Sequence, residues 1–235
     1  MKIMKNKIFL KIILMSLFLL PGRAFAEFEE LGTSARAAGM GNCFVAVADD
    51  AYSILYNPAG LGRIHHKEIV SSSSRLYWGL SDLTTIDENF IGGVYGTSSF
   101  GTVGIGMKRL AVSELYNENT AMISYGKAFG RRLSLGANIK NLSKGYNANP
   151  YTENAIDFTG SSYGRDPVFA NGYSKSILSY DAGGYYQISD NFSAGLAASD
   201  INRPDTGLGS VSELPATLKA GLCYKDDNLL VPFEV

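Results

Sequence analysis

The chain has 235 residues, enough for one or two domains of ordinary size. Without the five basic residues among the first 26 positions, sixteen basic and 22 acidic residues give the remaining 209 a formal charge of −6. This balance argues against a nucleic-acid partner, which normally requires a basic face. Glycine contributes about 12% of those 209 residues, against a usual ~7%, and costs a helix about 1 kcal/mol per position. Composition therefore excludes a helical bundle and favours an all-β protein.

The first 26 residues have the pattern of a secretory signal peptide. Four lysines lie within positions 2–11, an apolar run covers residues 12–20, and a Pro-Gly pair ends it. An Ala-Phe-Ala triplet then supplies small residues for cleavage near Ala26. Nine apolar residues are too few to cross a hydrocarbon core ~30 Å thick as a helix. We therefore predict export, with a mature chain that begins after residue 26.

From about residue 67 onward, apolar side chains occupy every second position in one segment after another. Leu133, Leu135 and Ile139, for example, alternate with Ser134, Gly136, Asn138 and Lys140. Successive strand residues point to opposite faces, so each segment has one apolar and one polar, glycine-rich face. We predict strands near residues 67–78, 85–96, 100–112, 119–129, 132–146, 176–188, 191–201 and 214–225, with a ninth from about 228.

The lengths of the connections between these strands alternate. Short connections are predicted at 97–99, 130–131, 189–190 and 226–227, and longer ones at 79–84, 113–118, 147–175 and 202–213. Outer-membrane β-barrels have short periplasmic turns and long external loops. Strands of 11–15 residues suit a tilted membrane span, which needs ~9–11, whereas strands are usually ~5–6 residues long. The pattern favours a transmembrane antiparallel barrel; a secreted β-rich surface protein or adhesin remains the alternative.

Residues 27–66 do not alternate and carry three short motifs. Ala-Arg-Ala-Ala-Gly-Met-Gly covers 35–41, Asp49-Asp50-Ala lies in the middle, and Asn57-Pro-Ala-Gly-Leu ends at Leu61. In this order, after a signal peptide and before repeated strands, they resemble the N-terminal region of the PorV/PorQ family, relatives of FadL-type transporters of long-chain fatty acids. The motifs cover about 40 residues, and the strand rhythm extends the resemblance to the rest of the chain.

The resemblance implies a barrel of about fourteen strands with residues 27–66 folded into its lumen as a plug. The plug motif that it implies consists of Asn57, Pro58, Ala59 and Gly60, with Asp49 and Asp50 upstream. An asparagine before proline is held out of the helical region, so the chain is expected to turn there. A turn that simply leads into the first strand is the alternative.

The eight predicted strands and the start of a ninth are too few for a fourteen-stranded barrel. A closed eight-stranded barrel has an interior just filled by side chains, without room for a 40-residue plug. An open sheet would leave unpaired backbone groups in lipid. Residues 67–235 are therefore expected to form an incomplete barrel, as the N-terminal part of a longer product.

Lumen-facing polar residues are the remaining binding candidates. Their positions in the alternation place Lys108, Asn138, Lys140 and Lys219 on the polar face of their strands, with Lys225 on the same face as Lys219. Inward lysines could meet a carboxylate head group, or pair with acids of the plug such as Glu30 and Asp49. We favour pairing with the plug.

Motifs for catalysis or metal binding are weak. The only histidines, His65 and His66, are adjacent and lack a ligand pattern, which favours a solvated turn. The glycines of residues 101–106 precede no predicted helix and are interpreted as strand glycines, not a phosphate loop. Cys43 and Cys223 could form a disulfide, although free thiols are favoured. No enzyme, cofactor or metal site is predicted.

The resemblance implies two roles for a non-enzymatic barrel in the cell outer membrane, surrounded by its lipid. The first is passive entry of hydrophobic small molecules, during which the plug rearranges. The second is a part in type IX secretion, in which the barrel binds and shuttles exported proteins. We predict transport of hydrophobic compounds, with secretion as the alternative.

Overall fold

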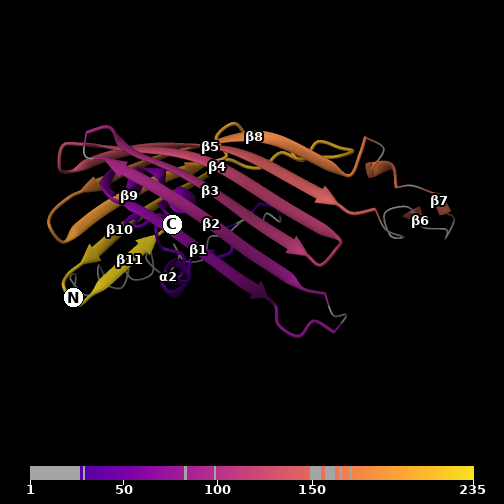
Figure 1. The fold of residues 1–235 in the computed structure, drawn as a ribbon, viewed down its shortest axis with the longest axis horizontal. Helices are drawn as coiled ribbons and strands as arrows, with labels where there is room; N and C mark the ends of the chain where they lie inside the picture. The colour runs from indigo at the N-terminus through magenta and orange to yellow at the C-terminus, as the bar shows by residue number, and fades with distance from the viewer. Residues whose placement is uncertain are drawn as a thin grey trace, which may run out of the picture.

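The computed structural model describes residues 27–235 apart from 29, 82–83, 98, 149–154, 157–161, 165 and 170. The predicted signal peptide therefore lies outside the described residues. The chain forms a nine-stranded sheet in the order β1-β2-β3-β4-β5-β8-β9-β10-β11, and every neighbouring pair is antiparallel (Figure 1). The all-β prediction is confirmed.

The sheet strands begin and end within three residues of their predicted bounds. They are β1 (Lys67–Leu76), β2 (Ile86–Thr97), β3 (Gly101–Val112), β4 (Tyr116–Phe129), β5 (Leu133–Tyr146), β8 (Ser174–Gln187), β9 (Phe192–Ser199), β10 (Thr217–Lys225) and β11 (Leu230–Glu234). Between β5 and β8, the short strands β6 (Ala155–Ile156) and β7 (Ser162–Gly164) form a hairpin away from the sheet, followed by the 3-10 helix η2 (Pro167–Phe169) (Figure 1).

The predicted alternation of short and long connections is wrong at one position. The connection between β3 and β4 covers only residues 113–115, because β4 begins at Tyr116 and not near 119. Ser113 adopts a positive φ of 44°, and the backbone N–H of Leu115 donates to the Val112 carbonyl, which closes this turn. The other connections at the same end, between β1 and β2, β5 and β8, and β9 and β10, are long as predicted.

The N-terminal segment, residues 27–66, contains three short helices that the sequence analysis did not predict. They are α2 (Ala35–Gly39), α3 (Ser53–Tyr56) and the 3-10 helix η1 (Pro58–Arg63). Ser34 caps α2 by accepting from the Ala37 N–H. Asn57 is extended, as expected before a proline, and caps η1 by accepting from the Ala59 N–H.

The two faces of the sheet differ in polarity. The inner face is the one covered by the N-terminal segment, and its buried residues include Thr102, Lys108, Ser124, Asn138 and Lys140. The opposite, outer face carries exposed apolar side chains, among them Ile91, Ile105, Met107, Ile123, Leu135, Ile139, Leu178, Leu196, Leu218, Leu222 and Phe233. This arrangement reverses that of a water-soluble protein, in which the apolar face is covered.

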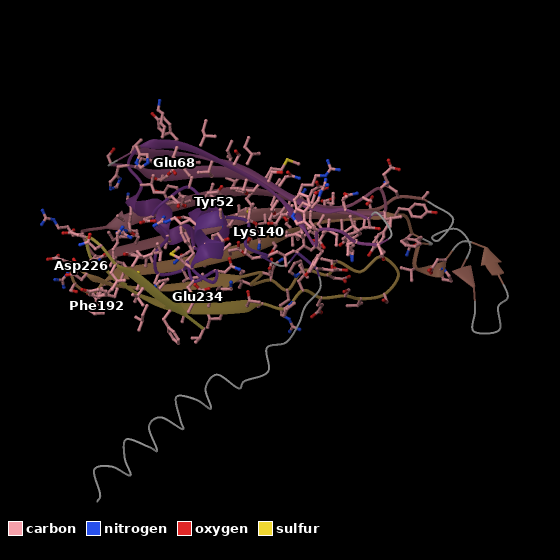
Figure 2. All side chains as sticks on the ribbon, turned by 90° about the horizontal axis from the view of Figure 1, so that it is seen from below. Tyr52, Glu68, Lys140, Phe192, Asp226 and Glu234 are labelled. Atoms are coloured by element: carbon pink, nitrogen blue, oxygen red, sulfur yellow. The ribbon has the colours of Figure 1, made fainter. Side chains whose placement is uncertain are left out.

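The sheet is open, and the N-terminal segment reaches both of its edges. At β1, the Glu68 carboxylate accepts from the Ala51 N–H, and the Ser71 carbonyl accepts from the Tyr52 hydroxyl. At β11, the Glu234 carboxylate accepts from the Val45 N–H. Figure 2 shows the segment between the strands at the two ends of the sheet, with Tyr52 and Lys140 inside.

Candidate functional site

Asn57 joins three parts of the chain through its side-chain amide. The fully buried side chain donates to the carbonyl oxygens of Val45 (2.8 Å) and Gly184 (3.2 Å), and its oxygen accepts from the Ala59 N–H (3.1 Å). Gly184 belongs to β8, so one amide ties the N-terminal segment to itself and to the sheet. Asn57, Pro58, Ala59 and Gly60 are all buried at this contact.

Glycines on the inner face allow this close approach. A Cβ on Gly136 would overlap the carbonyl of Pro58, and one on Gly183 would overlap the Asn57 amide oxygen. A Cβ on Gly195 would overlap the Val45 carbonyl in the same way. The glycine-rich polar face recognised in the sequence therefore serves as the contact surface for the N-terminal segment.

Replacing Asn57 by alanine should lower the free energy of unfolding by about 2 kcal/mol. It leaves the Val45 and Gly184 carbonyls without a donor, although water entering the vacated space would limit the loss. Asn57→Asp keeps the shape but places a carboxylate against two carbonyl oxygens, and should lose at least as much. The measurement is urea unfolding followed by far-UV circular dichroism. Exposed Asn141→Ala is the control; equal losses would contradict the role of Asn57.

Lys140 lies in a buried ion cluster on the inner face. Its Nζ is 2.8 Å from an oxygen of Asp181 and 2.8 Å from one of Asp200. Asn138 donates to Asp181 (3.0 Å) and to the carbonyl of Ile54 in α3 (2.9 Å). The backbone N–H of Asp200 also donates to Asp181, and Asp200 has a positive φ of 54°. The cluster therefore links β5 and β8 to α3 and to the start of the 200–216 connection.

Two other lysines pair with acids of the N-terminal segment. Lys108 lies 3.6 Å from Glu30, and Lys144 lies 2.6 Å from Glu27. The second oxygen of Glu27 accepts from the Thr206 hydroxyl in the 200–216 connection. Burial alone would raise the pKa of Glu30, but the charge of Lys108 and the N–H groups of the Thr33 turn outweigh it, so that its pKa is lowered.

A cavity of about 320 Å³ lies between these ion pairs. Its lining includes Glu27, Phe28, Glu30, Leu55, Tyr56, Lys108, Met122, Lys140, Leu142, Leu214 and Lys219. The Lys219 side chain is 41% exposed and meets Glu234 only at 3.6 Å, whereas that of Lys140 is 11% exposed. Apolar residues such as Leu55, Met122 and Leu142 and ion-paired residues such as Lys108 and Lys140 therefore line the same cavity.

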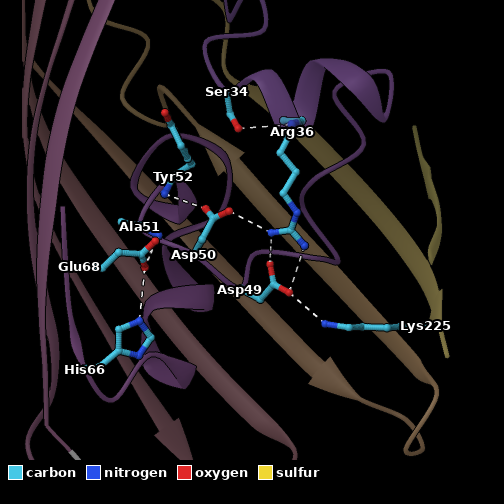
Figure 3. A network of polar contacts seen from close by, with 10 residues as sticks. Ser34, Arg36, Asp49, Asp50, Ala51, Tyr52, His66, Glu68 and Lys225 are labelled. Atoms are coloured by element: carbon cyan, nitrogen blue, oxygen red, sulfur yellow. Dashed lines mark hydrogen bonds and ion pairs between the residues drawn. The ribbon is translucent and has the colours of Figure 1, made fainter. Parts of the chain in front are cut away.

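Asp49 and Asp50, in the middle of the N-terminal segment, form ion pairs with Arg36 of α2 (Figure 3). Arg36 contacts Asp49 at 2.5 Å and Asp50 at 2.9 Å, and Lys225 of β10 lies 3.1 Å from Asp49. Burial alone would raise the pKa of Asp49, but the hydrogen bond and charge of Arg36, together with Lys225, lower it. The expected pairing of inner-face lysines with acids of the segment thus occurs for Lys108 and Lys225. Lys140 pairs instead with Asp181 of β8 and with Asp200 of the 200–216 connection, and Lys219 pairs with Glu234 of β11.

The Asp49 cluster should make a small, pH-dependent contribution to stability. Because the pKa of Asp49 is lower in the folded state, its carboxylate stabilises the fold at pH values above its ordinary pKa of about 3.8. This stabilisation is lost as the pH falls through the folded-state pKa. Asp49→Asn should therefore cost less than about 1 kcal/mol at pH 7, because the group is partly exposed. Urea titrations of both proteins at pH 7 and pH 3 should give a difference that shrinks at pH 3; a constant difference would contradict the ionic role.

The other candidates show no catalytic or metal-binding arrangement in the described parts of the chain. His65 and His66 are exposed, and His66 lies 3.6 Å from Glu68. Cys43 and Cys223 are free thiols. Among the described residues, no group of three or more histidine, cysteine or acidic side chains could hold a metal ion. A second cavity of about 340 Å³, near the 188–191 turn, is lined by Arg63, Tyr185 and Lys225 among others.

Sequence reasoning missed the acids that complete the Lys140 cluster. Asp181 lies directly opposite Asn138 in the β5–β8 register, so strand pairing would have revealed it. Asp200 follows the end of β9 and carries no periodic signal. Glu27 and Lys144 were missed because their contact spans 117 residues of chain.

Comparisons with known proteins give no relative for this fold and site. No family model matches the chain, and no curated protein or solved structure is significantly similar to it. Within the described residues, no helix combines the length and apolar character needed to cross a membrane.

Proposed function

We propose that this chain is a non-enzymatic β-barrel protein of an outer membrane that lets hydrophobic compounds cross passively. The observation that carries the proposal is the inverted polarity of the sheet. Its outer face exposes isoleucine, leucine and aromatic side chains, while its inner face buries lysine, asparagine and aspartate. Outer-membrane strands alternate in this way because one face meets lipid and the other a polar interior.

Residues 27–66 are proposed to act as the plug of this barrel. The contacts of Asn57 with β8 and of Glu27 and Glu30 with inner-face lysines support that role. β1 and β11 are the outermost strands of the described sheet, and hydrocarbon does not tolerate unpaired strand edges, so both edges are proposed to be paired within the membrane. The resemblance to the PorV/PorQ and FadL-type proteins implies about fourteen strands in all.

A disulfide lock between the segment and the wall tests the transport proposal. A Cβ on Gly221 would lie 3.3 Å from the Cβ of Ala46, close to the ~3.5–4.5 Å found in disulfides. The Ala46→Cys/Gly221→Cys variant is made in the closed barrel proposed above, with Cys43 and Cys223 changed to serine. It is expressed with its leader in a Gram-negative strain that lacks its own fatty-acid transporter. Uptake of a radiolabelled long-chain fatty acid should fall at least fivefold on oxidation and recover on reduction.

Each single-cysteine variant is the control and should be insensitive to oxidant. Uptake that never exceeds that of the empty strain would contradict transport. Uptake that is unaffected by a fully formed lock would contradict movement of residues 27–66. Recovery of the protein in the soluble fraction without detergent would instead support the secreted β-rich protein.

A further inference from the structure

The start of the N-terminal segment is held by polar contacts on the inner face of the sheet. The Glu27 carboxylate lies 2.6 Å from Lys144 of β5, and its second oxygen accepts from the Thr206 hydroxyl at 2.7 Å. The backbone N–H of the next residue, Phe28, donates to the Glu118 carboxylate of β4 at 2.9 Å. Residue 27 is therefore fixed beside two strands and the connection that follows β9.

Carboxylates outnumber lysines around this point. The Lys108 ammonium attracts three carboxylates, those of Glu30, Glu88 and Glu118. We call the whole set the acidic site; its described members are the acids Glu27, Glu30, Glu88 and Glu118 and the bases Lys108 and Lys144. Four carboxylates and two ammonium groups leave a formal charge of −2. Such an excess is costly where the groups are removed from water, and Glu88 and Glu118 are only 2% and 4% exposed.

The acidic site also lacks a hydrogen-bond donor. One oxygen of the buried Glu88 carboxylate accepts from the Thr33 hydroxyl at 2.7 Å. The other is buried and has no hydrogen-bond partner among the described residues. A buried acceptor without a donor costs free energy in its own right. The acidic site is therefore short of both positive charge and donors.

Removal of the leader would create a cation at this place. Cleavage after Ala26, which the sequence predicts, makes Glu27 the first residue and converts its backbone N–H into an α-ammonium group. Covalent geometry keeps neighbouring backbone nitrogens within ~3.6 Å of each other, so this ammonium lies at most ~6.5 Å from the Glu118 carboxylate that Phe28 contacts. In the uncleaved chain the same nitrogen belongs to a neutral amide.

We propose that the acidic site binds the α-ammonium group of the mature chain, so that removal of the leader completes the docking of the segment on the sheet. The ammonium group supplies both the charge and the donors that the site lacks. Glu27, Phe28 and Glu30 line the 320 Å³ cavity, so the same event fixes one of its walls. This inference goes beyond the proposed function, because it concerns maturation and does not depend on what crosses the membrane.

The reactivity of the new amino group tests the proposal. The full chain is exported with its leader, purified in detergent and treated with acetic anhydride over a range of pH. Mass spectrometry of the N-terminal peptide reports the reaction and identifies the first residue. The ordinary pKa of an α-amino group is ~7.7–8.0, and neighbouring carboxylates raise it. At pH 7 the amine should react at least tenfold more slowly in the folded protein than in urea, and half-maximal reactivity should move at least one pH unit higher.

Two changes separate the effect of charge from that of burial. Glu118→Gln removes a carboxylate but keeps the size of the side chain, and should raise the rate at pH 7 at least threefold. Glu114→Gln, at an exposed position of the preceding turn, is the matched control and should leave the rate unchanged. A Gly-Ser pair inserted between Ala26 and Glu27 moves the ammonium by up to ~7 Å without altering any side chain. It should return the pH of half-maximal reactivity to the urea value, and it remains informative if Glu118→Gln does not fold.

Three results would overturn the inference. The first is an amine that titrates in the folded protein as it does in urea. The second is a mature chain that begins at a residue other than Glu27. The third is an amine whose titration is insensitive to the Gly-Ser insertion, or equally sensitive to Glu118→Gln and Glu114→Gln. None of these results bears on transport, and failure of the uptake assay with a protected amine would contradict the proposed function alone.

Discussion

Replacing Lys140 by methionine is expected to lower the free energy of unfolding by about 3–5 kcal/mol. Methionine fills the space of the lysine stem but leaves the carboxylates of Asp181 and Asp200, both 2.8 Å from the lost ammonium, without their cation. A charge left unpaired in a buried site costs far more than an exposed one. Urea unfolding in detergent micelles, followed by far-UV circular dichroism, measures the change.

Lys219→Met is the matched control for this prediction. Its side chain is more exposed than that of Lys140 and its single partner is 3.6 Å away, so the loss should stay below about 1 kcal/mol. Adding Asp181→Asn to Lys140→Met should recover part of the loss, because one uncompensated charge disappears. Similar losses for the two lysine variants, or no recovery, would show that the ion cluster does not hold this part of the fold.

Substitution of Gly136 by alanine should cost about 3 kcal/mol, because the added methyl group has no space. It would overlap the Pro58 carbonyl carbon and oxygen and approach the Ala59 nitrogen to 2.6 Å. These are backbone atoms, so η1 itself has to move away from β5. The hydrogen bonds that Asn57 makes across this contact would weaken with it.

Gly184→Ala provides the control on the neighbouring strand. Gly184 faces outward, and a Cβ there meets only the Leu135 side chain at 3.9 Å. Because glycine within a strand costs ~0.5–1 kcal/mol relative to alanine, this variant should be neutral or slightly more stable. Urea unfolding and protease resistance of residues 27–66 distinguish the two variants. A Gly136→Ala protein as stable as the control would contradict the close packing of the segment on the sheet.

The sequence predicted the sheet well because its signal is local. Alternation of Leu133, Leu135 and Ile139 with Ser134 and Asn138 defines a strand and its two faces without any knowledge of its neighbours. It did not predict α2, α3 and η1, which are four to six residues long and too short to show helical periodicity. The caps Ser34 and Asn57, the latter followed by Pro58, were the available signals.

The candidate site was predicted less completely than the sheet. Parity placed Lys108, Asn138 and Lys140 on the inner face, where the structure buries them. Their partners could not be predicted, because contacts such as Asn138 with Ile54 or Lys144 with Glu27 join residues 84 and 117 positions apart. Such pairs depend on the path of the N-terminal segment across the sheet, which no period in the sequence records.

The sequence by itself determined the strands and their two faces, since both follow from the alternation of neighbouring residues. Only the tertiary structure decided the contact of Asn57 with β8 and the composition of the Lys140 cluster. Each requires strand register and the placement of a non-periodic segment, which are set by packing among residues distant in the chain. Inner-face glycines such as Gly136 illustrate the difference. Their frequency is visible in the sequence, but only the structure shows that Gly136 makes room for the backbone of Pro58.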